Sequence, residues 1–128
     1  MTCAAPEEGC ALLLGRRGSP HGAAVPWHGQ RIWPCLNTWP EPAERRRRFA
    51  IDPREQLLAQ KWARQRGLAV LGAAHSHPSG QAVPSPTDCA LTLAPALMLI
   101  LAADGDLAAW WLDDTDRQPQ PLPWRMDA

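Results

Sequence analysis

The amino-acid sequence predicts one mixed α/β domain, and three observations support this fold class. The chain has 128 residues, whereas a closed eight-stranded β/α barrel needs roughly 250. Hydrophobic residues make up 45% of the chain, which is enough for a core. Apolar runs typical of strands alternate with capped helices, in the order strands, helix, strand, helix, strands. We therefore predict a single domain over residues 1–128, with a core at about residues 7–113 and a polar, proline-rich tail at 114–128.

The first strand is predicted at residues 10–14, an apolar run followed by a turn that begins at Gly15. Prolines and glycines recur every few residues from 19 to 42, which predicts short, irregular strands in this region. The chain has 14 prolines in all, and this number argues against a helical bundle.

The clearest helix follows Asp52, which can cap it. Pro53 suits the first helical position and Gly67 can end the helix. Its apolar face is expected to comprise Leu57, Leu58, Ala59, Trp62 and Ala63. Residues 68–74 then form an uninterrupted apolar run, as an interior strand covered on both faces would.

The second half of the chain contains one short helix and two strands. Residues 85–88 have the pattern of a helix start, and Pro95 is expected to end this helix. Residues 96–102 and 107–112 are strand candidates, joined by a turn at Asp104 and Gly105.

Composition excludes several classes of protein. Thirteen basic and thirteen acidic residues give a net charge of zero, so we expect no nucleic-acid partner and no membrane surface. The longest apolar stretch, at residues 90–103, is too short and too interrupted to span a bilayer. The N-terminus lacks the basic and apolar regions of a signal peptide, and the cysteines form no C-x-x-C pair. We therefore predict a cytoplasmic protein with reduced cysteines.

The polar segment after the interior strand, residues 75–88, contains the candidate metal ligands. His75 and His77 are two residues apart, so on a strand both side chains point to the same face. Asp88, in the first turn of the short helix, can supply a third ligand if the helix folds back over the strand end. Two imidazoles and a carboxylate suit one catalytic Zn²⁺, because three protein ligands leave a fourth position for water.

Two further residues can complete such a site. Glu8 is a candidate general base if the first strand lies beside the histidine strand, with Glu7 as its rival. Ser85 is a candidate donor to the oxyanion that develops during hydrolysis. In the alternative interpretation, Ser85 and Asp88 are no more than a helix-capping pair and the histidines are turn residues.

These residues resemble the signature of the JAMM (MPN+) zinc metalloproteases: H-x-H-P, six residues, Ser, two residues, Asp, from His75 to Asp88. Upstream, residues 8–15 (EGCALLLG) are similar to the family's E-x-C-G-x-L-x-G, with Ala11 in place of a glycine. Residues 49–53, the helix that follows and residues 67–72 are similar to the short prokaryotic branch. The resemblance covers roughly residues 7–113.

The resemblance implies a curved mixed β-sheet flanked by helices, in which His75, His77 and Asp88 bind zinc. It also implies that Glu8 activates the water and that Ser85 helps to stabilise the oxyanion. The family usually has a helix ahead of the catalytic glutamate. Only seven residues precede Glu8, so that helix is expected to be missing.

The function implied by the resemblance is hydrolysis of a peptide or isopeptide bond at the C-terminal Gly-Gly of a ubiquitin-like or sulfur-carrier protein. We expect this tail to add to a sheet edge near the metal. A DNA-repair-associated branch with a similar pattern ranks lower, and an H-x-H amidohydrolase is excluded by length. The alternative from another class is a catalytically silent MPN-type scaffold. The arginine run at residues 45–48 is interpreted as a solvated loop or as a docking patch for an acidic ubiquitin-like surface.

Overall fold

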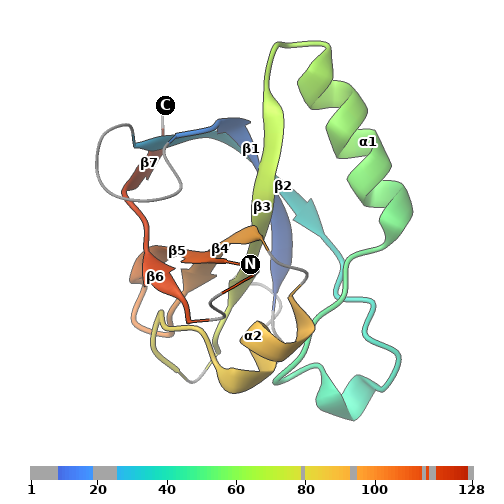
Figure 1. Cartoon of the computed structure of the whole chain (residues 1–128). Helices are drawn as coiled ribbons and strands as arrows, with labels where there is room; N and C mark the ends of the chain where they lie inside the picture. Colours follow the sequence, from blue (N-terminus) through green and yellow to red (C-terminus); the bar gives the residue numbers. More distant parts are fainter. Residues whose placement is uncertain are drawn as a thin grey trace.

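The structure, a computed structural model, describes residues 9–18, 26–78, 80–92, 95–113, 115 and 118–126. These residues form one mixed α/β domain around a seven-stranded sheet with the strand order β6-β5-β4-β3-β1-β2-β7. The sheet curls, so that β5 and β6 run across the direction of β1 and β2 in Figure 1. The predicted fold class is confirmed. The strands are β1 (Cys10–Arg16), β2 (Trp27–Cys35), β3 (Ala69–Ser76), β4 (Ala96–Leu101), β5 (Leu107–Leu112), β6 (Gln120–Pro121) and β7 (Trp124–Met126).

Strand β3 lies in the interior of the sheet, antiparallel to β1 and parallel to β4. The two faces of the sheet bury different apolar clusters. Leu13, Leu71 and Leu99 belong to the cluster on one face, and Leu12 and Leu14 belong to the cluster on the other. This alternation along β1 is the period of two that a strand buried on both faces requires.

Helix α1 (Pro53–Arg64) covers the second face, beside β3 (Figure 1). Asp52 caps it as predicted, accepting a hydrogen bond from the backbone N–H of Arg54. The predicted apolar face is only partly right. Ala59 and Ala63 are buried against the sheet, whereas Leu57 and Leu58 are 65% and 55% exposed. The small alanines therefore face the sheet, and the leucines lie on the far side of the helix.

Strand β2 corrects the prediction of short, irregular strands between residues 19 and 42. Residues 27–35 form one nine-residue strand, and residues 19–25 lie outside the described part of the chain. Pro34 is compatible with this strand because β7 pairs only with residues 27–29. At Pro34 β2 is therefore an edge strand, where the missing N–H is not needed.

The C-terminal residues differ from the expected polar tail. They contribute β6, which pairs with β5 at one edge of the sheet, and β7, which pairs with β2 at the other. Leu122 is buried in the core and Trp124 packs against it. Two apolar side chains thus fix a segment whose overall composition is polar.

Helix α2 (Pro86–Leu91) and strands β4 and β5 lie where they were predicted, although α2 ends at Leu91, before Pro95. Gly105 has a φ of 95° in the turn between β4 and β5, a conformation that favours glycine. Within the described ranges, no helix is long and apolar enough to cross a membrane. The prediction of a missing leading helix concerns residues 1–8, which lie outside those ranges.

Candidate metal centre and substrate cleft

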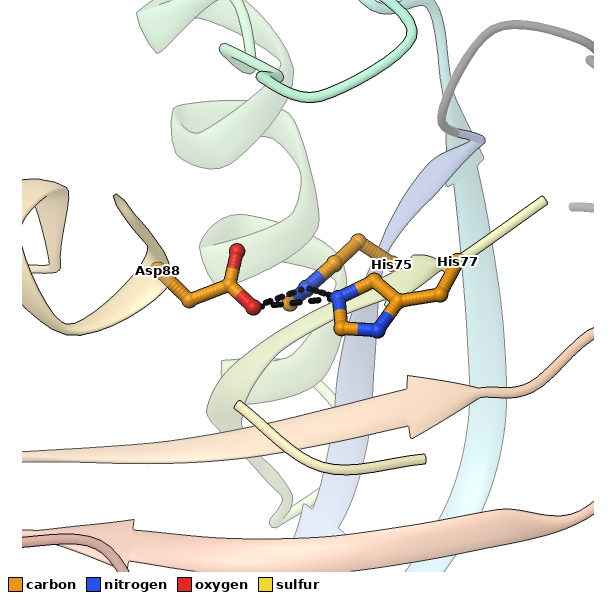
Figure 2. Close-up of side chains that lie close together, drawn as sticks. All are labelled: His75, His77 and Asp88. Atoms are coloured by element: carbon orange, nitrogen blue, oxygen red, sulfur yellow. Dashed lines mark hydrogen bonds and ion pairs between the residues drawn. The ribbon is translucent and has the colours of Figure 1, made fainter. Parts of the chain in front are cut away.

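The C-terminal end of β3 carries both histidines. His75 lies between Cys10 of β1 and Ile100 of β4 in the strand register, and His77 directly follows the strand. The two rings share one face of the sheet, as their spacing predicts. Figure 2 shows both imidazoles converging with the Asp88 carboxylate on one point.

Helix α2 brings Asp88 to the histidines through a capping box at its first turn. The Asp88 backbone N–H donates to Ser85 Oγ at 3.0 Å, and the Ser85 backbone N–H donates to Asp88 Oδ2 at 2.9 Å. Asp88 Oδ2 also lies 3.1 Å from His75 Nε2 and 3.0 Å from His77 Nε2. Ser85 and Asp88 thus form a capping pair, but not only that, because the same carboxylate also belongs to the histidine cluster.

The three atoms fit one face of a tetrahedral metal site. His75 Nε2 and His77 Nε2 are 3.1 Å apart, so all three separations are close to 3 Å. Ligand atoms at tetrahedral angles, about 2.0–2.1 Å from zinc, lie about 3.3 Å from one another. These three residues are the group within the described residues that could hold a metal ion. The side chains of His75 and Asp88 are 2% and 3% exposed, whereas that of His77 is 12% exposed, so the cluster opens on the side of His77.

The hydrogen bond at His77 Nδ1 leaves Nε2 as the ring atom that can face a metal ion. His77 Nδ1 lies 2.8 Å from the backbone carbonyl oxygen of Gln81. A carbonyl oxygen can only accept, so Nδ1 carries the proton and Nε2 of the neutral ring presents a lone pair. That lone pair faces Asp88 Oδ2 at 3.0 Å. In the metal-free chain this contact is a hydrogen bond from a protonated Nε2 to Asp88, and a metal ion between the two atoms would take the place of that proton.

Asp88 is held in its ionised form. Burial alone would raise the pKa of Asp88, but hydrogen bonds from His75 and His77 outweigh it. The result is a pKa far below the usual range of an aspartic acid. An ionised carboxylate beside two imidazoles is a donor set that Zn²⁺ accepts.

Phe49 packs on the back of the cluster. Its ring stacks on the His75 imidazole with centroids 4.6 Å apart and an interplanar angle of 24°. His75 Nδ1 is buried and has no hydrogen-bond partner among the described residues. Stacking therefore restrains a ring that no hydrogen bond at Nδ1 holds.

Of the two predicted catalytic residues, the structure describes one. Ser85 precedes α2, and its Oγ accepts from Asp88, which leaves the hydroxyl proton available for donation. Glu8 lies outside the described residues. Its neighbour Gly9 is held beside the histidine strand, because Gly9 N–H donates to Ser76 Oγ at 2.8 Å and Ser76 N–H donates to the Gly9 carbonyl at 2.9 Å. The role of Ser76 in holding Gly9 was not predicted from the sequence. A polar residue in an apolar strand, on the face opposite the two histidines, could have indicated it.

Two cavities adjoin the cluster. One of about 230 Å³ is lined by Arg46, Arg47, His77, Pro78, Gly80, Ser85 and Thr87. A larger one of about 460 Å³ is lined by His75 and Asp88, and its walls include Leu12, Phe49, Leu91 and Met98. The smaller cavity contains both the most exposed of the three candidate ligands and the Ser85 hydroxyl. We therefore treat it as the candidate substrate cleft.

Comparison with known proteins places this geometry in a family. The family of prokaryotic homologs of the JAB domain matches residues 1–113. A probable TtuB-protein conjugate cleaving protease of Thermus thermophilus is 37% identical over 84 residues, which are 66% of this chain and 48% of that protein. A desampylase of Pyrococcus furiosus is 34% identical over 70 residues, covering 54% of this chain and 50% of that protein. The chain thus matches about half the length of these relatives.

Solved structures agree on the fold. The solution structure of a Desulfitobacterium hafniense protein superposes with a TM-score of 0.74 and 30% sequence identity, covering 98% of this chain and 84% of that one. A Salinibacter ruber protein gives a TM-score of 0.65 and 26% identity, with 98% and 82% coverage.

Proposed function

Because the chain belongs to the family of prokaryotic homologs of the JAB domain, we propose that it is a zinc-dependent peptidase. Its substrate is the C-terminal Gly-Gly tail of a ubiquitin-like or sulfur-carrier protein, joined to a further group by a peptide or isopeptide bond. The names of the Thermus and Pyrococcus relatives, a conjugate-cleaving protease and a desampylase, support this proposal. The observation that carries it is the convergence of His75 Nε2, His77 Nε2 and Asp88 Oδ2, which lie about 3 Å from one another.

His75, His77 and Asp88 would hold the zinc ion. Zinc supplies Lewis-acid polarisation of the scissile carbonyl and a lowered pKa of the attacking water. Glu8 takes a proton from this water and passes it to the leaving amine. The Ser85 hydroxyl, which lines the cleft, donates to the oxyanion as it forms.

The position of β3 modifies the expected mode of substrate binding. β3 is paired on both sides, with β1 and with β4, so a substrate tail cannot add to the sheet beside His75. The tail instead enters through the cleft over the end of β3, where Pro78, Gly80 and Ser85 form part of the wall. A cleft of about 230 Å³ limits the size of the side chains next to the scissile bond, which favours glycine on the acyl side.

The test combines metal analysis with a matched pair of variants. Protein purified without chelator is expected to contain one zinc per chain and to cleave a carrier protein extended beyond Gly-Gly. Glu8→Gln should retain the zinc and lose about 10²–10⁴-fold in kcat, the usual contribution of general acid–base catalysis. Glu7→Gln removes the same charge one residue earlier and should keep wild-type kcat.

Two outcomes contradict the proposal. Wild-type activity in Glu8→Gln would exclude Glu8 as the base. A chain that neither contains zinc nor takes it up would instead favour the silent scaffold, since a scaffold needs no metal for binding a partner.

A further inference from the structure

The substrate cleft has a positively charged wall. Arg46 and Arg47 line it together with His77 and Ser85, and no carboxylate is among the described residues that line it. A substrate that reaches His77 through this cleft passes these arginines. The cleft therefore favours a negatively charged group close to the scissile bond.

Arg46 differs from the other three arginines of the run at residues 45–48. Arg45 Nε donates to the Trp39 backbone carbonyl at 2.8 Å. Arg47 and Arg48 lie 2.9 Å and 3.9 Å from the Glu44 carboxylate. Within the part of the chain that the structure describes, Arg46 has no hydrogen bond, ion pair or ring contact. It is exposed in the cleft, with its guanidinium available to a ligand.

We propose that Arg46 forms a carboxylate subsite for the leaving group of the substrate. This proposal rests on the proposed function. A carboxylate accepts two parallel hydrogen bonds from a guanidinium, which makes this pair both strong and directional. Asn37 Nδ2 donates to the Arg48 carbonyl at 2.9 Å, and Arg45 and Arg48 both contact Trp39, so Arg46 is presented to the cleft by an ordered turn.

The position of the scissile bond decides which side of the substrate carries the carboxylate. On the acyl side the two nearest residues are glycines in mid-chain, which have no charged group. On the leaving side, a single amino acid attached through its α-nitrogen has its own carboxylate within one residue of the bond. Hydrolysis adds the hydroxyl of water to the glycine carbonyl and a proton to this nitrogen, and the released amino acid keeps its carboxylate.

A lysine joined through its side chain offers no carboxylate at this distance. The subsite therefore selects carriers with a short α-linked C-terminal extension over isopeptide conjugates.

Three peptides of the carrier tail test the subsite: one ending in Gly-Gly-Ala with a free carboxylate, its C-terminal amide, and a Gly-Gly-Asp amide. Binding to the metal-free full chain is measured by calorimetry, and cleavage by the zinc-loaded chain is measured in parallel. The free acid should bind roughly tenfold more tightly than the alanine amide, as expected for a charge-assisted hydrogen bond. Arg46→Ala should remove this difference and Arg46→Lys should keep part of it. Arg54→Ala, which removes an arginine paired with Asp52 outside the cleft lining, should leave it unchanged.

Equal binding of the acid and the alanine amide by the wild-type chain would overturn the proposal, as would an undiminished preference in Arg46→Ala. Tight binding of the aspartate amide would assign the subsite to carboxylates in general, and weak binding would assign it to the chain end. If no peptide is cleaved in a zinc-dependent manner but the binding preference persists, the peptidase proposal fails and the carboxylate subsite stands.

Discussion

Trp110 Nε1 donates a hydrogen bond to the backbone carbonyl oxygen of Ala82 at 2.9 Å, and this bond ties β5 to the segment between β3 and α2. The preceding carbonyl in that segment belongs to Gln81 and lies 2.8 Å from His77 Nδ1. The indole thus fixes the acceptor that fixes the histidine tautomer. Groups of this kind orient the ligands of a metal site and tune its affinity.

Trp110→Phe should therefore weaken zinc binding. Loss of a direct hydrogen-bond partner of a ligand typically costs 10–100-fold in metal affinity, and we expect about tenfold here because Trp110 acts one residue away. Competition with a chromogenic chelator measures the zinc Kd. No substitution of Trp110 that lacks a hydrogen-bond donor is expected to restore the wild-type zinc Kd.

Trp111→Phe is the matched control. It removes the same indole nitrogen from the next residue, but Trp111 Nε1 is buried without a partner among the described residues. Its ring packs against Trp27 with centroids 5.7 Å apart, on the other face of the strand. Trp111→Phe should lower stability through lost packing and leave the zinc Kd unchanged. A Kd shift of equal size in the two variants would show that only packing is involved.

Phe49→Ala should also lower zinc affinity, because it removes the ring that stacks on His75. Aromatic pairs contribute about 0.5–1.5 kcal/mol beyond their buried area, which corresponds to about 2–12-fold in Kd. Phe49→Tyr retains the ring and should restore the wild-type Kd, whereas Phe49→Leu retains bulk alone and should not. Equal zinc affinity in the alanine and tyrosine variants would rule out orientation of His75 by Phe49.

The grouping of the three candidate ligands could be predicted from sequence because each position rests on local geometry. The spacing of His75 and His77 places them on one face of a strand, and the capping pattern places Asp88 in a first helical turn. Only the folding of α2 over the end of β3 had to be assumed. The short-range rules of strands and helix caps therefore predicted the positions of His75, His77 and Asp88.

The residues that support the ligands could not be predicted in this way. Trp110 is 28 residues from Ala82, and Phe49 reaches His75 from a different segment of the chain. Such contacts depend on how the sheet curls, which no local pattern encodes. The same reason explains the error at Leu57 and Leu58: helical periodicity identifies an apolar side, but the close approach of α1 to the sheet selects the small residues Ala59 and Ala63.

Gly72→Ala should destabilise the protein by about 1–3 kcal/mol, the usual cost of overpacking. Gly72 is paired with Leu97 in the register of β3 and β4, and a Cβ at this position would overlap the Leu97 backbone carbonyl. Urea unfolding measures the change. Gly80→Ala is the control, since its Cβ would make an ordinary contact of 3.4 Å with the His77 side chain. A change under about 0.5 kcal/mol in Gly72→Ala would mean that β4 can move away freely.

The stability of the metal-free protein should depend on the ionisation of Asp88. The folded-state pKa of Asp88 lies well below its unfolded value of about 3.9, so the stabilisation is fully present above that pH. It is lost as the pH falls from about 4 toward the folded-state pKa. The difference in unfolding free energy between wild type and Asp88→Asn should therefore shrink below about pH 4 and stay constant from pH 5 to 6. A difference that grows with acidification would contradict the lowered pKa.

The tautomer of His77 gives the most direct test of the metal centre. With zinc bound, Nε2 is occupied and the proton must reside on Nδ1, where the Gln81 carbonyl accepts it. Two-bond nitrogen–proton correlation spectra of the imidazoles distinguish this form from the Nε2–H form. Chelation should then protonate Nε2 as well, because its lone pair still faces the ionised Asp88 carboxylate at 3.0 Å. His28, which lies outside the cluster and does not line either cavity beside it, should keep its spectrum throughout. A neutral Nε2–H form of His77 in the zinc-loaded protein would show that this ring does not bind the metal through Nε2.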